Sequence, residues 1–230
     1  LDDNARALLM VLMAYNQKKD PLALELLPIY LSYIHYMQNP DGTFRNFLSF
    51  KREYLDQVGS EDSFGRSVWA LGYLLGNSPN DAYYQTGRMI FFEAMPNFEK
   101  LQSIRGMANT IVGICYYLRT NKSDDSMTEI LSKLTKRIIN QYQKEKTPEW
   151  KWFESVLTYD NGILPLALFH AAEFLKEDVI IETAIETMDF LSKITLSDEY
   201  LSLIGNDEWY RLGQERSLYA QQPVDALSMI

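Results

Sequence analysis

The sequence predicts an all-α protein built as an (α/α) toroid of helical hairpins. Three observations support this fold class. Apolar residues recur at spacings of three and four along most of the chain. Alternating runs rich in β-branched residues are few. The breaks between the expected helices are of two contrasting kinds, short and polar or long and aromatic.

The apolar spacing predicts helices at 3–18, 22–38, 62–77, 80–95, 102–120, 125–144, 161–176, 178–194 and from 222 onward. Short polar turns with helix-capping residues lie inside each pair of helices: KKDP, NSPND, TNKSDD and LKED. Long segments rich in aromatic, acidic, arginine and glutamine residues separate the pairs, at 39–66, 146–161 and 201–226. If successive helices reverse direction, every long segment lies at one end of the molecule, which we expect to be the functional end.

The helices differ in how much of their surface is apolar. Residues 64–76 and 106–118 are apolar nearly all round and contain Gly and Ala, as expected for inner helices that pack closely on several sides. Residues 125–144 keep a charged face, which indicates an outer helix. With 230 residues, 47% of them hydrophobic, we expect one domain over residues 1–230.

Composition argues against several partners and functions. The net charge is -9 and no basic patch is present, which argues against nucleic acid. No apolar run approaches the roughly 18 residues of a membrane span, so we expect no membrane partner. The chain begins LDDNARALLM, with no initiating Met, no basic n-region and no cleavage site, so the start resembles a domain boundary and a targeting signal upstream stays open. For this segment a cytoplasmic location is favoured.

The single cysteine and the two histidines suggest no metal or redox chemistry. Cys115 lies in an apolar run and has no second cysteine to pair with, so we expect a core residue. His35 and His170 lie in apolar helical stretches without a second ligand at metal-binding spacing. Glycine-rich phosphate motifs are lacking as well, and we expect no cofactor.

An acid-and-arginine pattern opens two of the expected inner helices. Ser60 is a suitable N-cap, and Glu61 and Asp62 would interact favourably with the helix N-terminus. Arg66 lies one turn inside a helix expected to be buried and needs a partner. Asp3 and Arg6 repeat the pattern at the chain start. Two interpretations stay open: simple capping, or acids and arginines that line a polar pocket.

Two later segments combine aromatic and polar side chains before a helix. Aromatic rings offer a stacking surface for a pyranose, and carboxylates and amides bind its hydroxyls. The alternative is that the aromatic rings only pack the loops. The residues assigned to substrate binding are Asp3, Arg6, Glu61, Arg66, Arg105, Trp152, Tyr159, Asn161, Trp209, Tyr210, Gln221, Gln222 and Asp225.

The segment QNPDGTF has two interpretations. It contains a Q-x-x-D-G-aromatic element similar to the repeats of terpene cyclases and related α-toroids. The simpler interpretation is a type I turn centred on Asp41 and Gly42, with Phe44 as a plug.

As a set, DDNARALL, SEDSFGRSVWALGY, WKWFESVLTYDNGILPLAL and QQPVDA resemble the (α/α)-barrel domains of the six-hairpin glycosidase-like superfamily, in particular a bacterial group often fused to glycosyltransferases. The resemblance spans almost the whole chain. Because that superfamily closes six hairpins, the resemblance implies that this domain is an incomplete (α/α)6 barrel, truncated on its C-terminal side. It also implies a glycan ligand and a glycosyltransferase module in the parent chain.

A glycosidase needs two carboxyl groups across its cleft, and inverting enzymes hold them about 6.5–9.5 Å apart. We expect Asp62 and Asp160 to form the catalytic pair, with Glu154 as a substitute acid among aromatic neighbours. The alternative is a carbohydrate-binding accessory domain of a glycosyltransferase. A helical scaffold is disfavoured because the unusual residues gather at one set of hairpin ends. Epimerases share the toroid, but neither histidine fits the proton-transferring pair they use.

Overall fold

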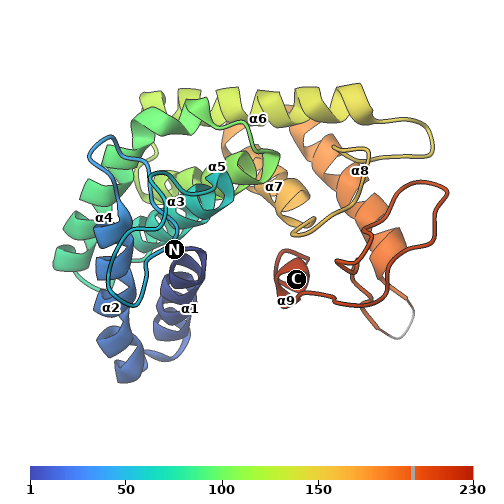
Figure 1. The fold of residues 1–230 in the computed structure, drawn as a ribbon. Helices are drawn as coiled ribbons and strands as arrows, with labels where there is room; N and C mark the ends of the chain where they lie inside the picture. The colour runs from blue at the N-terminus through green and yellow to red at the C-terminus, as the bar shows by residue number, and fades with distance from the viewer. Residues whose placement is uncertain (198–199, 230) are drawn as a thin grey trace. The chain divides into compact units, whose positions relative to one another are not determined.

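The computed structural model describes residues 1–197 and 200–229, and in these ranges its regular structure is almost entirely helical (Figure 1). The helices are α1 Asp2–Lys18, α2 Pro21–Met37, α3 Glu61–Gly76, α4 Asp81–Ala94, a 3-10 helix Met95–Lys100, α5 Ile104–Thr120, α6 Asp125–Glu145, α7 Ile163–Leu175, α8 Asp178–Thr195 and α9 Pro223–Leu227. Each helix expected from the sequence is present within about two residues of its expected limits, except that residue 230 of the last one lies outside the described ranges.

The chain divides into two compact units, residues 1–131 and 132–230. Helix α6 contributes residues to both. In the first unit, α1 and α2 pack as one helical hairpin, and α3 and α4 form the next. The turns within these hairpins are capped as the sequence predicts, since the side chain of Asp20 accepts a hydrogen bond from Leu22 N and that of Asn80 from Tyr83 N.

Helices α1, α3 and α5 of the first unit run parallel to one another. Near the helix starts, Arg66 of α3 lies 2.9 Å from Asp2 of α1, and near their ends Asn16 donates to the hydroxyl of Tyr73 at 3.4 Å. The α3–α5 contact has the same direction, because Gly65 lies against Gly106 and Gly72 lies against Gly113. The three inner helices therefore begin at one end, as hairpin reversal predicts for this unit.

Glycine permits the closest approach between α3 and α5. A Cβ added at Gly72 would lie 2.0 Å from the carbonyl oxygen of Gly113. Most of α3 and α5 is consequently buried, including Cys115, which is fully shielded in the core. This tight packing fixes the N-terminal ends of the two helices side by side, together with the polar residues that begin them.

The segment after α2 forms a turn and a plug. Gly42 N donates to Asn39 O, so the turn is centred on Pro40 and Asp41, one residue earlier than expected. The ring of Phe44 is 2% exposed and packs on Phe64 at 5.5 Å between ring centres. The plug interpretation of this segment is therefore confirmed.

The second unit joins α7 and α8 as a hairpin and ties its two long segments together. Leu157 and Tyr210 exchange both backbone hydrogen bonds, which links segment 146–162 to segment 200–222. Arg216 donates to the carbonyl oxygens of Ile194 and Ser202. The long segments are therefore ordered by specific bonds. Within the described ranges, no helix is both long and apolar enough to cross a membrane.

Candidate functional site

The first part of the candidate site is an ion-pair cluster at the start of α1 and α3. The carboxylate of Asp2 lies 3.0 Å from Arg6 and 2.9 Å from Arg66. The side chain of Arg66 is only 9% exposed, so the pair is largely shielded from screening by water. Asp3 lies farther away, at 3.9 Å from Arg6, and its side chain is 96% exposed. Asp2, one residue earlier than the sequence interpretation placed the acid, thus joins the two arginines.

The second part is formed where α3 and α5 begin. Ser60 caps α3, as expected, by accepting a hydrogen bond from Ser63 N at 3.2 Å. The carboxylate of Glu61 instead accepts from the backbone N–H groups of Gln102 and Ser103, just ahead of α5. Asp62 accepts from the hydroxyl of Ser103 at 2.7 Å. The two acids thus satisfy groups at the N-terminus of the neighbouring helix, where negative charge is favourable.

Arg105 completes the cluster from the first turn of α5, where its residue is 4% exposed. Apart from Asp3, the acids and arginines predicted on α1, α3 and α5 are partly or fully buried at one end of the first unit. They are Arg6, Glu61, Asp62, Arg66 and Arg105. Such a set places acceptors and donors at the same end of three helices, and it suits a ligand with many hydroxyl groups.

A separate polar cluster occurs in the second unit, at the start of α7 and α9. Asn161 N donates to Asp225 at 3.4 Å, and Ser228 donates to Asp160 at 3.5 Å. The amide side chain of Asn161 bonds both backbone groups of Thr158. Asp160 and Asp225 are each 3% exposed. Asp160 has a φ of 47°, so the chain turns sharply there just ahead of α7.

The aromatic residues of the long segments differ in exposure. Trp152 is fully buried, with Phe153 and Phe190 at 5.2 and 6.3 Å between ring centres. Its ring therefore packs the core of the unit. Tyr159 and Trp209 lie 6.1 Å apart and are both partly exposed, and so is Tyr210. Only these last three predicted aromatic residues present ring surface to solvent.

The remaining predicted residues have mixed placements. Gln221 accepts a hydrogen bond from Leu203 N and donates to Leu218 O, so both ends of its amide hold the backbone. Gln222 is exposed and precedes α9 without a side-chain cap. Glu154 is partly buried, and its carbonyl oxygen accepts from the indole of Trp150 at 2.6 Å.

The structure adds aromatic residues that the sequence interpretation missed. Along α3, Trp69 and Tyr73 follow Asp62 and Arg66 at helical spacing, and they are partly exposed although the rest of the helix interior is buried. Tyr116 of α5 lies 4.8 Å from Tyr73 between ring centres. Trp69 and Tyr73 lie seven and eleven residues after Asp62, and this helical spacing could be seen in the sequence. Because nearly all residues around them are apolar, the sequence did not indicate which face of the helix is exposed.

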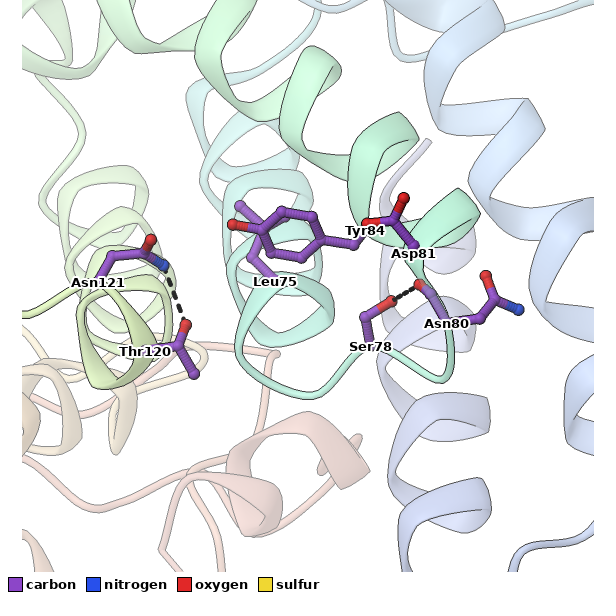
Figure 2. A pocket seen from close by; sticks show the side chains of 7 residues that line it. All are labelled: Leu75, Ser78, Asn80, Asp81, Tyr84, Thr120 and Asn121. Carbon is purple, nitrogen blue, oxygen red and sulfur yellow. Dashed lines mark hydrogen bonds between the residues drawn. The ribbon is translucent and has the colours of Figure 1, made fainter.

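A pocket of about 450 Å³ lies at the opposite ends of α3 and α5 (Figure 2). It is lined by Leu75, Ser78, Asn80, Asp81, Tyr84, Thr120 and Asn121. Several of its polar side chains are occupied locally, as in the bonds from Ser78 to Asn80 O and from Asn121 to Thr120. No residue predicted to bind substrate lines it.

Next to this pocket, Tyr117 is held by the α5–α6 turn. Burial, assisted by the hydrogen bond that its hydroxyl donates to Asp124, raises the pKa of Tyr117 to about 12. Asp124 also accepts from Met127 N and so caps α6. The bonds that Asp124 accepts from Tyr117 and Met127 are therefore explained by capping of α6 and need no ligand.

Among the described residues, no group of three or more His, Cys, Asp or Glu side chains is placed to hold a metal ion. His35 is exposed on α2, and His170 lies 3.7 Å from Glu173 on α7.

Comparison with known proteins gives a fold likeness. No model of a known family and no curated protein matches the sequence. Among solved structures, the cellobiose 2-epimerase from Spirochaeta thermophila DSM 6192 is similar, with a TM-score of 0.56, 10% sequence identity, and coverage of 98% of this chain and 82% of that one. This likeness supports the expected fold class, an all-α helical toroid.

Proposed function

We propose that this protein is carbohydrate-active and binds an oligosaccharide at the N-terminal ends of its inner helices, where it acts as a glycoside hydrolase. The observation that carries the proposal is the gathering of Asp2, Glu61, Asp62, Arg66 and Arg105 at one end of three parallel helices. The likeness in fold to a cellobiose 2-epimerase supports a sugar ligand for this type of architecture.

Hydrolysis would use two carboxyl groups, one to protonate the glycosidic oxygen and one to activate water or attack the sugar. The proposed pair is the one expected from the sequence, Asp62 and Asp160, with Glu154 as the substitute acid. The hydroxyl of Ser103 fixes one oxygen of Asp62, which limits rotation of that carboxylate. The partly exposed Tyr159, Trp209 and Tyr210 would supply stacking surface.

The test combines turnover and binding on a panel of oligosaccharides. We expect Asp62→Asn and Asp160→Asn to abolish hydrolysis while binding measured by calorimetry stays nearly unchanged, because an amide keeps the shape of the carboxylate but neither gives nor takes the proton. Asp81→Asn and Asp178→Asn change acids at the starts of outer helices and should leave turnover unchanged. Full hydrolysis by both Asn variants would overturn the assigned roles.

A non-catalytic alternative is favoured by one observation. Glu61 and Asp62 already hold the start of α5, so these acids have a structural function whether or not they react. In that case the domain would hold a glycan for a glycosyltransferase module of the parent chain. Wild-type protein that binds glycans but converts none of the panel would decide for this accessory function.

Epimerisation is the other reaction that the panel must detect, since the similar structure is a cellobiose 2-epimerase. Inversion at carbon 2 requires removal and return of a proton there. Incubation with cellobiose in D2O distinguishes the outcomes by NMR: epimerisation gives a new disaccharide, often deuterated at carbon 2, whereas hydrolysis releases glucose. A new disaccharide without glucose would replace the hydrolase proposal.

A further inference from the structure

One face of α3 is open although the helix is otherwise buried. Apart from Gly76 at its end, the only side chains of α3 that are not buried are Glu61, Asp62, Trp69 and Tyr73. Steps of seven and four residues return to the same face of a helix, so Asp62, Trp69 and Tyr73 form one stripe. Trp69 lies about 10 Å along the helix axis from Asp62, and Tyr73 about 16 Å.

Trp69 has an unused hydrogen-bond donor on this face. Its indole Nε1 is shielded from solvent and has no hydrogen-bond partner among the described residues, while the residue as a whole is partly exposed. Buried indole N–H groups are usually paired, because an unpaired donor costs free energy. The side chain therefore presents a flat apolar surface beside a donor that lacks an acceptor.

An unused acceptor lies on the neighbouring helix. The Oδ1 of Asn109 on α5 is buried without a hydrogen-bond partner among the described residues, while its Nδ2 donates to Arg105 O at 2.9 Å. Asn109 packs against α3, because a Cβ at Gly65 would lie 2.9 Å from its Cβ. A donor and an acceptor on adjoining inner helices match a hydroxyl group, which can accept one bond and donate another.

Below Trp69, side chains from all three inner helices meet. Tyr73 of α3 packs edge-to-face on Tyr116 of α5, and its hydroxyl accepts a bond from Asn16 of α1 at 3.4 Å. Arg119 lies over the ring of Tyr116 at 4.5 Å. These contacts join α1, α3 and α5, and the exposed face of α3 ends at Tyr73.

We propose that Trp69 is a sugar-binding and specificity-determining residue, which stacks on a pyranose one sugar unit away from the one at Asp62 and donates its indole N–H to a hydroxyl oxygen of that sugar. The inference rests on the proposed carbohydrate function and adds a second sugar-binding position to that site, with the residue that recognises the sugar there. The distance of about 10 Å between Asp62 and Trp69 supports this, because a disaccharide spans it and a single pyranose does not.

The experiment compares the dissociation constants of a disaccharide and a monosaccharide. Cellobiose, maltose and lactose are the disaccharide probes, and glucose and galactose are the monosaccharide probes. Trp69→Phe keeps a flat ring but removes the N–H, and it should weaken disaccharide binding about fivefold, the worth of one hydrogen bond. Trp69→Ala also removes the stacking surface and should weaken it by about tenfold or more. Monosaccharide binding should change less than twofold.

The control is Phe50→Ala, which removes a fully exposed ring on the segment between α2 and α3 and should leave both constants unchanged. Melting temperatures show that each variant is folded, and Trp69→Phe remains informative if Trp69→Ala is not. Unchanged disaccharide binding by folded Trp69 variants overturns the inference while the carbohydrate function stands. Equal losses for both sugar sizes also overturn it. If the wild-type protein binds no glycan of any panel, the proposed function fails and the inference fails with it.

Discussion

We predict that Gly72→Ala forces α3 and α5 apart. The three atoms nearest to a Cβ at position 72 are all backbone atoms of Gly113, among them its carbonyl oxygen at 2.0 Å and its Cα at 2.7 Å. Ordinary van der Waals contact begins at 3.4 Å, so the oxygen would have to move by the difference of 1.4 Å. Two packed helix backbones cannot yield locally, as the tip of a side chain can, and the strain therefore spreads along the α3–α5 contact.

The magnitude follows from two opposing effects. Overpacking a well-packed core costs about 1–3 kcal/mol, and the backbone collision places Gly72→Ala at the upper end, about 3 kcal/mol. Alanine offsets about 1 kcal/mol of this because it is the better helix former. The net loss of about 2 kcal/mol should lower the melting temperature of a chain of this size by about 4–8 °C.

The matched control is Gly87→Ala, in the interior of α4. Its Cβ would lie 2.6 Å from the Cδ2 atom of Leu74, the end of a flexible side chain that can rotate away. Helix propensity gains the same amount there, so calorimetry should show an unchanged or higher melting temperature. If Gly72→Ala melts no lower than Gly87→Ala, the close backbone contact that aligns the starts of α3 and α5 is refuted.

Three further predictions concern the pH dependence, the site and the domain. The hydrogen bond from Tyr142 lowers the pKa of Glu186 below 4.5, so its contribution to stability is present above pH 4.5 and is lost as the pH falls through the lower folded-state value. Urea unfolding should therefore show a smaller acid loss of stability in Glu186→Gln than in wild type, and parallel curves would contradict this. Ser60→Ala and Ser103→Ala should each cost about 1 kcal/mol of unfolding free energy as lost helix caps, but only Ser103→Ala should also reduce turnover, because the hydroxyl of Ser103 donates a hydrogen bond to Asp62. Equal turnover in the two variants would show that Asp62 needs no such support. Finally, because α6 runs without interruption through the boundary between the two units, we expect one calorimetric transition for residues 1–230, and two resolved transitions would contradict the single-domain prediction.

The helices were predictable because their signals are local. Capping side chains such as Asp20, Asn80 and Ser60 stop or start a helix through bonds to residues two or three positions away. Likewise, the glycines of α3 and α5 indicated close packing between inner helices, and the structure confirms it at Gly72. The parallel direction of α1, α3 and α5 then follows from counting helices, which needs no knowledge of tertiary contacts.

Partner choice in the acidic cluster could not be predicted in the same way. Asp2 and Asp3 are adjacent in sequence, yet Asp2 bridges Arg6 and Arg66 while the side chain of Asp3 is 96% exposed. Neighbouring positions differ by about 100° around a helix axis, so the choice depends on the rotation of α1 against α3. That rotation is set by the packing of the whole hairpin, and no local pattern encodes it.

Aromatic residues show why composition misleads about ligand contacts. Trp152 stands in the segment with the strongest sugar-binding appearance, yet it is fully buried, since a long segment needs large apolar side chains to fill the space beneath it. Trp69 stands in an apolar helix and looks like a core residue, yet it is partly exposed. On an inner helix almost every position is covered by a neighbouring helix, so a partly exposed aromatic side chain there marks the one face without a packing partner. The helical spacing that places Trp69 on the face of Asp62 and Arg66 is therefore a stronger indication of a ligand contact than the density of aromatic residues in a loop.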